Sequence, residues 1–151
     1  MTATYKKIEK SDIEILVAMM RDFYAIDGYP MDEKVTRELF SEFIAHENLG
    51  KAWLIIVDES IVGYVILTFV FSFEHKGKIT FLDELYIAER VRGKGIGNET
   101  IQFIKAQSLI LSIKLLFLEV EHHNTIAEQL YVSNGFELHH RKFLSHKPQT
   151  I

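Results

Sequence analysis

The stretch LDELYIAERVRGKGIGNET, Leu82 to Thr100, decides how this sequence is interpreted. It begins as a mainly apolar segment, passes through glycines at positions 93, 95 and 97, and continues as a run with helical spacing. The whole chain has only 8 glycines, so this cluster needs a structural reason. Because glycine costs backbone entropy and supplies no core contact, the cluster predicts left-handed backbone or the close approach of a ligand.

The glycine cluster has the composition of an anion site. A strand, a tight glycine-rich loop and a helix N-terminus bring unpaired amides together, and the helix dipole adds about half a positive charge. Glycines let a phosphate approach the backbone, while Arg92 and Lys94 can pair with phosphates at the rim. A bland alternative, a solvated basic turn before an ordinary helix, stays open at this point.

Two familiar phosphate loops do not fit these residues. A P-loop needs G-x-x-x-x-G-K-[ST], whereas Gly93 and Lys94 are followed by Gly95 and lack the earlier glycine. A dinucleotide fingerprint needs G-x-G-x-x-G in a parallel unit, but this loop reads G-K-G-I-G and follows segments that indicate an antiparallel meander. Both patterns are therefore rejected.

The composition favours a single domain over residues 1–151. Hydrophobic residues make up 48% of the chain, and 17 basic against 21 acidic side chains give a net charge of −4, which disfavours nucleic-acid partners. The lack of cysteine excludes a disulfide scaffold and a thiolate metal site. No signal peptide and no apolar run of roughly 20 residues are recognisable, so we expect a cytoplasmic protein without a membrane partner.

Helical periodicity predicts four helices. The first is expected to begin at Ser11 through a capping box with Glu14, and the second near Asp32 as its N-cap. A third follows the glycine loop. The fourth runs from Asn124 to Asn134, where Gly135 suits the C′ position.

Strand patterns complete a mixed α/β (α+β) domain with the order β-α-α-β-β-β-α-β-α-β-β. Runs at 51–58, 61–73 and 78–87 are rich in β-branched and aromatic residues and indicate a meander. KLLFLEV (114–120) is apolar on both faces, as expected of a central strand. Two last strands are expected at FELHH (136–140) and KFLSH (142–146), and Trp53 is expected in the core.

The chain resembles the GNAT superfamily of N-acetyltransferases. Arg92, Gly95 and Gly97 match its R-x-x-G-x-G loop, and LEVEHHNTIAEQLYVSNGFE (118–137) is similar to the second half of its domain. The resemblance implies a mixed, mostly antiparallel sheet flanked by helices. It also implies that the strands FLDELYI (81–87) and LLFLEV (115–120) splay apart to admit acetyl-coenzyme A (acetyl-CoA).

The same resemblance assigns the cofactor contacts. It implies that the glycine loop holds the pyrophosphate, that the backbone at Leu85, Tyr86 and Ile87 bonds the pantetheine arm, and that Asn124 and Tyr131 reach that arm from the last helix. The loop residues concerned are Arg92, Gly93, Lys94, Gly95, Ile96, Gly97 and Asn98.

Acetyl transfer needs a general acid and a way to deprotonate the amine. Tyr131 is the candidate acid, although a half-buried tyrosine that only packs its helix is the plain alternative. Asp83 and Glu84 are the candidate bases. Adjacent strand residues face opposite ways, so a regular strand presents only one of them to the cleft, whereas a bulge re-aims the other. The pair resembles the polyamine and diamine branch, with the order reversed to Asp then Glu.

The acceptor wall is expected in MRDFYAIDGYPMDE (20–33), where carboxylates alternate with aromatic rings. Such a lining suits a small cationic amine, and Tyr24, Asp27 and Tyr29 are the candidate contacts. Acidic residues near helix starts also have an ordinary explanation in the helix dipole. The histidine pairs at 122–123 and 139–140 are interpreted as solvated or packing residues, so no metal is expected.

Three functions are carried forward. The favoured one is acetyl-CoA-dependent N-acetylation of a small amine by direct attack, with a protein amine as the variant. The second is a non-catalytic CoA-binding or regulatory module, and the third is a phosphate-binding protein that prefers nucleotides. A homodimer is compatible with each of them.

Overall fold

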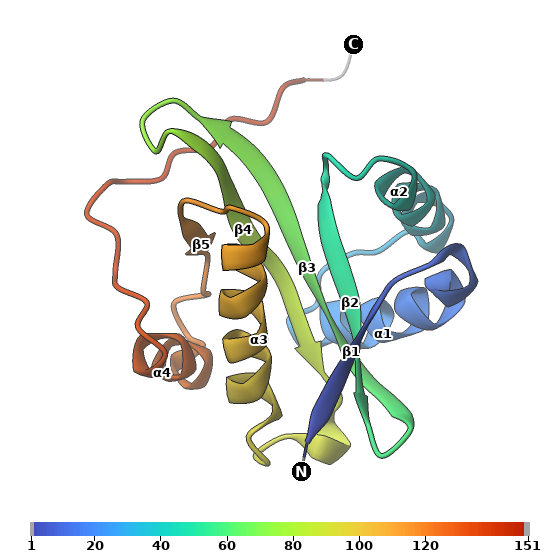
Figure 1. Cartoon of the computed structure of the whole chain (residues 1–151). Coiled ribbons are helices and arrows are strands. Elements are labelled where there is room, and N and C mark those ends of the chain that lie inside the picture. Colours follow the sequence, from blue (N-terminus) through green and yellow to red (C-terminus); the bar gives the residue numbers. More distant parts are fainter. Residues whose placement is uncertain (1, 150–151) are drawn as a thin grey trace.

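The computed structural model describes residues 2–149, which form a mixed sheet with helices on both faces (Figure 1). The strands of this part of the chain are β1 (Ala3–Lys7), β2 (Gly50–Val57), β3 (Ser60–Ser72), β4 (Gly77–Ile87) and β5 (Leu116–Leu118). They lie in the order β1-β2-β3-β4-β5. Neighbours are antiparallel except β4 and β5, which are parallel. The predicted fold class is confirmed.

Helices cover both faces of the sheet. They are α1 (Ile13–Ile26), α2 (Glu33–Ala45), α3 (Ile96–Ile110) and α4 (Thr125–Ser133), with the short 3-10 turns η1 (Lys10–Asp12) and η2 (Glu89–Val91). α1 and α2 lie on one face, and α3 lies on the other with α4 beside it (Figure 1). Within residues 2–149 no helix is both long and apolar enough to span a bilayer.

Alternate residues of β3 divide the core between the two faces. Tyr64 and Ile66 belong to the core that packs under α1 and α2, whereas Val65 and Leu67 belong to the core that packs under α3. Trp53 is buried in the second core, as expected. β3 is covered on both faces and pairs with β4 from Gly63 to Ser72, and β4 carries residues 83–87 of the candidate site.

The sequence predicts the start of α2 correctly but misplaces the cap before α1. Asp32 caps α2 as expected, since its carboxylate accepts from the Val35 amide at 3.2 Å. The capping box before α1 was expected at Ser11 but is formed by Glu9 and Asp12 around η1. Asp12 accepts from the Glu9 amide at 2.8 Å, so Ser11 lies inside the turn rather than at the cap.

The last two expected strands are wrong, and the strand before them is shorter and less central than expected. KLLFLEV was expected as a central strand, but only Leu116–Leu118 pair with β4, at the edge of the sheet and partly exposed. No strand forms at FELHH or KFLSH in the described chain, and Leu138 and Phe143 are 93% and 75% exposed. An alternating pattern becomes a strand only when a neighbouring strand pairs with its backbone. The tail does not pair with β5, so the tail forms no strand and β5 remains the edge of the sheet.

The end of α4 matches its prediction. Gly135 has a φ of 91°, and the amides of Gly135 and Phe136 donate to the carbonyls of Val132 and Tyr131 at 3.0 and 3.1 Å. This pair of bonds is the Schellman arrangement that a C′ glycine permits. It turns the chain directly after Asn134.

Asn134 ties α4 to α3. The side chain is 6% exposed, donates to Asn98 Oδ1 at 2.7 Å and to the Leu130 carbonyl at 2.8 Å, and accepts from Gln102 at 2.6 Å. Its backbone carbonyl also accepts from Lys105. The glycine loop precedes α3 and Tyr131 lies on α4, so this residue fixes one relative to the other.

Replacing Asn134 with alanine is therefore expected to destabilise the fold. Removing a buried amide and leaving its partners unpaired costs about 2 kcal/mol, which lowers Tm by about 6 °C in a domain of this size. Thermal unfolding followed by circular dichroism measures this. Asn48→Ala is the matched control, because Asn48 is exposed and its loss should move Tm by about 1 °C or less. Equal Tm values for the two variants would contradict the role of Asn134.

Candidate active site

A β-bulge at Asp83 arranges the two candidate carboxylates. Leu82 pairs with Leu67 of β3 and Glu84 pairs with the next residue, Ile66, so Asp83 is the extra residue. The bulge reverses the expected alternation and brings Glu84 onto the α1 face, beside Tyr64. The bulge considered from the sequence is present.

Glu84 is a buried carboxylate held by two phenols. Tyr24 of α1 donates to Oε2 at 2.7 Å, and Tyr64 of β3 donates to Oε1 at 2.8 Å. Burial raises the pKa of Glu84, the two phenol hydrogen bonds act against that rise, and the nearby Asp83 adds to it. Partial burial also raises the pKa of the more exposed Asp83. Glu84 is therefore the carboxylate that is positioned for a specific task.

A pocket of about 380 Å³ opens beside Glu84. Its wall comes from the end of α1, the following loop and β4, and the residues that line it are Phe23, Tyr24, Asp27, Tyr29, Pro30 and Glu84. The expected acceptor residues Tyr24, Asp27 and Tyr29 are thus brought together with Glu84. Asp83 does not line this pocket.

Two contacts from the segment between β5 and α4 reach the same loop. His123 Nε2 lies 3.2 Å from Asp27 Oδ1, and Tyr29 donates its hydroxyl to Glu121. Sequence reasoning missed Glu121, His123 and also Tyr64. The sequence gives a signal only for Tyr64, which is the one tyrosine in the otherwise apolar run IVGYVIL (61–67).

The edge of β4 next to this pocket is open. Pairing with β5 ends at Leu82 and Leu118, so the two strands separate just before the bulge, as expected. The Ala88 amide donates to the Val62 carbonyl at 2.7 Å on the β3 side. By the two-residue strand period, the backbone groups of Leu85 and Ile87 then point to the open edge.

Tyr86 differs from its two neighbours. The strand period directs its backbone groups to β3, and its ring packs in the α1 core with ring centroids 5.6 Å from Phe23. Of the three residues expected to bond a ligand through the backbone, the structure offers Leu85 and the amide of Ile87, whose carbonyl already accepts from Arg92.

The glycine loop exposes a set of amides at the start of α3. Gly93 and Gly95 have φ values of 75° and 83°, and Gly95 is the N-cap of the helix without a side-chain cap. No backbone carbonyl of residues 2–149 accepts from the amides of residues 93–98. Gly97 has a different reason: an added Cβ would lie 3.2 Å from Leu130 of α4. The loop therefore presents a group of unpaired amide donors.

The polar residues of the loop divide into two groups. Arg92 Nε donates to the Ile87 carbonyl at 2.7 Å, and its guanidinium lies over the Tyr86 ring, 5.8 Å from the centroid. Asn98 accepts from Asn134, as described above. Lys94 is exposed and forms none of the ion pairs found in residues 2–149. The ammonium of Lys94 is thus available to an anion.

Tyr131 lies where α4 meets the separated strands. It packs against the same buried core as Leu85 and Leu118, and its ring makes an edge contact with Phe136 at 5.8 Å. Burial raises the pKa of Tyr131 to about 12, so its hydroxyl keeps its proton at neutral pH. Asn124 is the N-cap of α4 and accepts from the Ala127 amide at 3.1 Å, which leaves its NH₂ group as a donor.

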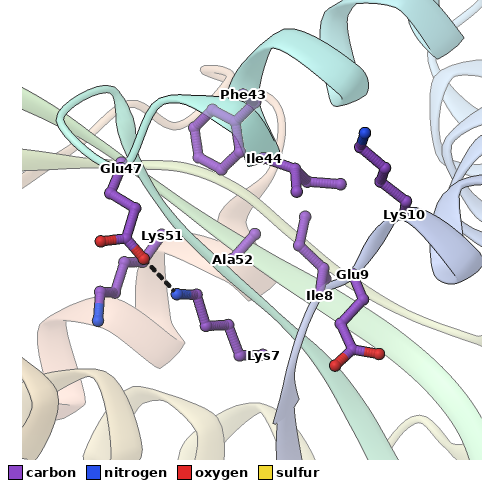
Figure 2. A pocket seen from close by; sticks show the side chains of 10 residues that line it. Lys7, Ile8, Glu9, Lys10, Phe43, Ile44, Glu47, Lys51 and Ala52 are labelled. Atoms are coloured by element: carbon purple, nitrogen blue, oxygen red, sulfur yellow. Dashed lines mark hydrogen bonds and ion pairs between the residues drawn. The ribbon is translucent and has the colours of Figure 1, made fainter.

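Another hollow, of about 290 Å³, lies between β1, β2 and the end of α2 (Figure 2). Ile8, Phe43, Ile44 and Ala52 form its apolar floor, and an ion pair of 2.7 Å joins Lys7 to Glu47 across it. None of the expected site residues lines this hollow. The candidate site is therefore the open edge of β4 with its loop and pocket.

Comparisons with known proteins agree with this geometry. The model of the acetyltransferase (GNAT) family matches residues 15–136. The D-amino-acid N-acetyltransferase HPA3 of Saccharomyces cerevisiae is 24% identical over 137 residues, covering 87% of this chain and 83% of that protein. An integron cassette protein from a salt-marsh metagenome has a TM-score of 0.86 at 27% identity, covering 97% and 91% of the two chains. A predicted acetyltransferase from Clostridium acetobutylicum, solved with acetyl-CoA, has a TM-score of 0.80 at 18% identity, with 96% of each chain covered.

Proposed function

The chain belongs to the acetyltransferase (GNAT) family, and on this premise we propose that it acetylates a primary amine of a small cationic molecule with acetyl-CoA as donor. The observation that carries the choice of acceptor is the pocket beside the open strand edge. It combines the carboxylates of Asp27 and Glu84 with three aromatic rings and has no lysine or arginine among its described lining residues. Ammonium groups favour both carboxylates and aromatic faces.

The residues of the candidate site fit acetyl-CoA. The unpaired amides of residues 93–98 and the ammonium of Lys94 would hold the pyrophosphate, and the open backbone of Leu85 and the Ile87 amide would hold the pantetheine arm. Asn124 would donate its NH₂ group to the same arm. Bound there, acetyl-CoA supplies an activated acetyl thioester.

Side chains of the protein would then accept the proton of the amine and donate a proton to the leaving thiolate. An alkyl ammonium with a pKa near 10.4 must lose a proton before it attacks, and the buried Glu84 is placed to accept it. Asp83, on the bulge, is the second acceptor and would act from the open side. Tyr131 would keep a proton at its hydroxyl as the general acid, and an amide at the open edge would face the developing negative charge.

A free amino acid is the second candidate acceptor, because the yeast relative named above acts on D-amino acids by its name. Such a substrate adds a carboxylate, which the pocket would meet with Asp27 and Glu84 rather than with a cation. We therefore place it after the diamine and polyamine class.

A thiol-release assay over an acceptor panel tests the proposal. With diamines, polyamines, an aminoglycoside and D-amino acids at equal concentration, we expect kcat/KM for the multiply charged amines to exceed that for D-amino acids by about tenfold or more. The opposite order would reject the cationic acceptor. CoA binding without thiol release for any amine of the panel would favour a non-catalytic module.

Asp27→Asn is expected to lower kcat/KM for a diamine about fivefold and to leave a monoamine of equal length nearly unchanged. The neutral side chain cannot pair with the distal ammonium of the diamine. Such a partly exposed ion pair contributes about 1 kcal/mol to binding. Initial rates at two salt concentrations measure this, since screening should shrink the diamine advantage of the wild-type protein. Equal losses for both amines would mean that Asp27 does not bind the distal charge.

A further inference from the structure

We propose that Tyr64 is a positioning residue that acts through Glu84: its hydroxyl fixes one carboxylate oxygen inside the protein, so that the other oxygen faces the acceptor pocket as the proton acceptor. The proposal rests on the function proposed above and adds a residue that does not touch the substrate. Tyr64 does not line the pocket, whereas Tyr24 and Glu84 do.

The geometry around Tyr64 is fixed on every side. Tyr64 is 0% exposed on a strand that is covered on both faces, and its ring contacts Phe23 and Tyr86, with centroids 6.4 and 5.8 Å away. The hydroxyl can therefore present its proton in one direction, toward Glu84 Oε1 at 2.8 Å. Glu84 Oε2 accepts from Tyr24, which lines the pocket, whereas Oε1 accepts from Tyr64, which does not.

Within residues 2–149, no cation is placed to compensate the charge of Glu84. The titratable groups that act on it are Tyr24 from α1, Tyr64 from β3 and Asp83 from β4, and Asp27 and Tyr29 share its pocket. None of the ion pairs formed by residues 2–149 includes Glu84. The two phenol bonds are then the interactions that favour the ionised form against burial.

The bulge at Asp83 brings Glu84 within hydrogen-bond distance of Tyr64. A regular strand would turn Glu84 away from the α1 face, where Tyr64 and Tyr24 lie. With Asp83 inserted, Glu84 lies opposite Ile66 and meets both hydroxyl groups. Tyr64 thus donates to a carboxylate whose direction is set by the bulge at Asp83.

Tyr64→Phe tests the proposal, with Tyr5→Phe as the matched control. Tyr5 loses a comparable hydroxyl, 3.1 Å from Thr100 on the α3 side, far from the pocket. The carboxyl carbon of Glu84 is followed by NMR titration of the ¹³C-labelled apo protein, and Glu84→Gln identifies its signal. Because a bond to the charged form is lost, we expect Glu84 in Tyr64→Phe to titrate at higher pH than in the wild type, and Tyr5→Phe to match the wild type.

The kinetic arm uses the same variants. At pH 6 we expect kcat/KM of Tyr64→Phe to fall about tenfold relative to wild type and to recover as the pH rises, because the base is protonated over a wider range. The Kd for CoA should stay unchanged. An unchanged Glu84 titration in Tyr64→Phe, or a loss of rate that is equal at every pH, overturns the positioning role.

A second variant and a separate readout keep the two proposals apart. Tyr24→Phe removes the other phenol bond and should also move the Glu84 titration to higher pH. If Tyr64→Phe does not fold, a Glu84 titration in Tyr24→Phe that is unchanged from wild type overturns the claim that the phenol bonds favour the ionised carboxylate. If the variants show these shifts in the Glu84 titration but the wild-type protein transfers no acetyl group, the proposed function is contradicted. The positioning of Glu84 by Tyr64 would still stand.

Discussion

Tyr131→Phe is expected to lower kcat about 100-fold while the Kd for CoA changes by less than about threefold. General acids contribute about 10² to 10⁴ in rate, and the phenol of Tyr131 keeps its proton through a pKa raised to about 12. Phenylalanine preserves the packing of the ring against the core under α3 and against Phe136. The loss should therefore appear in turnover and not in binding.

Stopped-flow or coupled thiol-release assays at saturating acceptor measure kcat, and calorimetry with CoA measures Kd. Tyr5→Phe again serves as the control, because it removes a tyrosine hydroxyl from the same side of the sheet without approaching the strand edge. If Tyr131→Phe turns over at the wild-type rate, Tyr131 only packs its helix, which is the plain alternative considered from the sequence.

Gly95→Val is expected to raise the Kd for CoA about 30-fold or more. Gly95 has a φ of 83° at the N-cap of α3, and a β-branched residue cannot adopt this conformation without strain of about 1 to 3 kcal/mol. Space is not the obstacle, since an added Cβ meets nothing within 4 Å. The strained backbone would instead turn the amides of residues 93–98 away from their common direction.

Gly28→Val is the matched control for strain. Gly28 also has a positive φ, 68°, and open space around its Cβ position, but it lies in the loop after α1. Both variants should lose similar amounts of thermal stability, and only Gly95→Val should lose affinity for CoA in calorimetry. Equal affinities would show that the loop amides do not bind the cofactor.

The sequence predicted the parts of the fold that depend on local chemistry. Asp32 and Gly135 have side-chain and backbone properties that specify a helix start and a helix end without help from distant residues. The tail at 136–146 has the right alternation for strands but needs a partner edge, which no local pattern specifies. The capping box before α1 moved by two residues because Glu9 and Asp12 satisfy the same spacing rule as Ser11 and Glu14.

For the site, the sequence predicted which residue types gather but not how they are aimed. The φ values of Gly93 and Gly95 agree with the reason given for the cluster, and Tyr24, Asp27 and Tyr29 do share one pocket with Glu84. The direction of Glu84 depends on a bulge, and the role of Tyr64 depends on the register between β3 and β4. Both are properties of strand pairing, which sequence spacing does not reveal.

The central claim is that the loop at residues 93–98 and the open edge of β4 together hold acetyl-CoA, and a crystal structure of the protein with CoA tests it most directly. The account predicts pyrophosphate oxygens accepting from the amides of this loop, the pantetheine arm along Leu85 and Ile87, and the sulfur beside the Tyr131 hydroxyl. CoA bound elsewhere, with these amides facing only water, would contradict it.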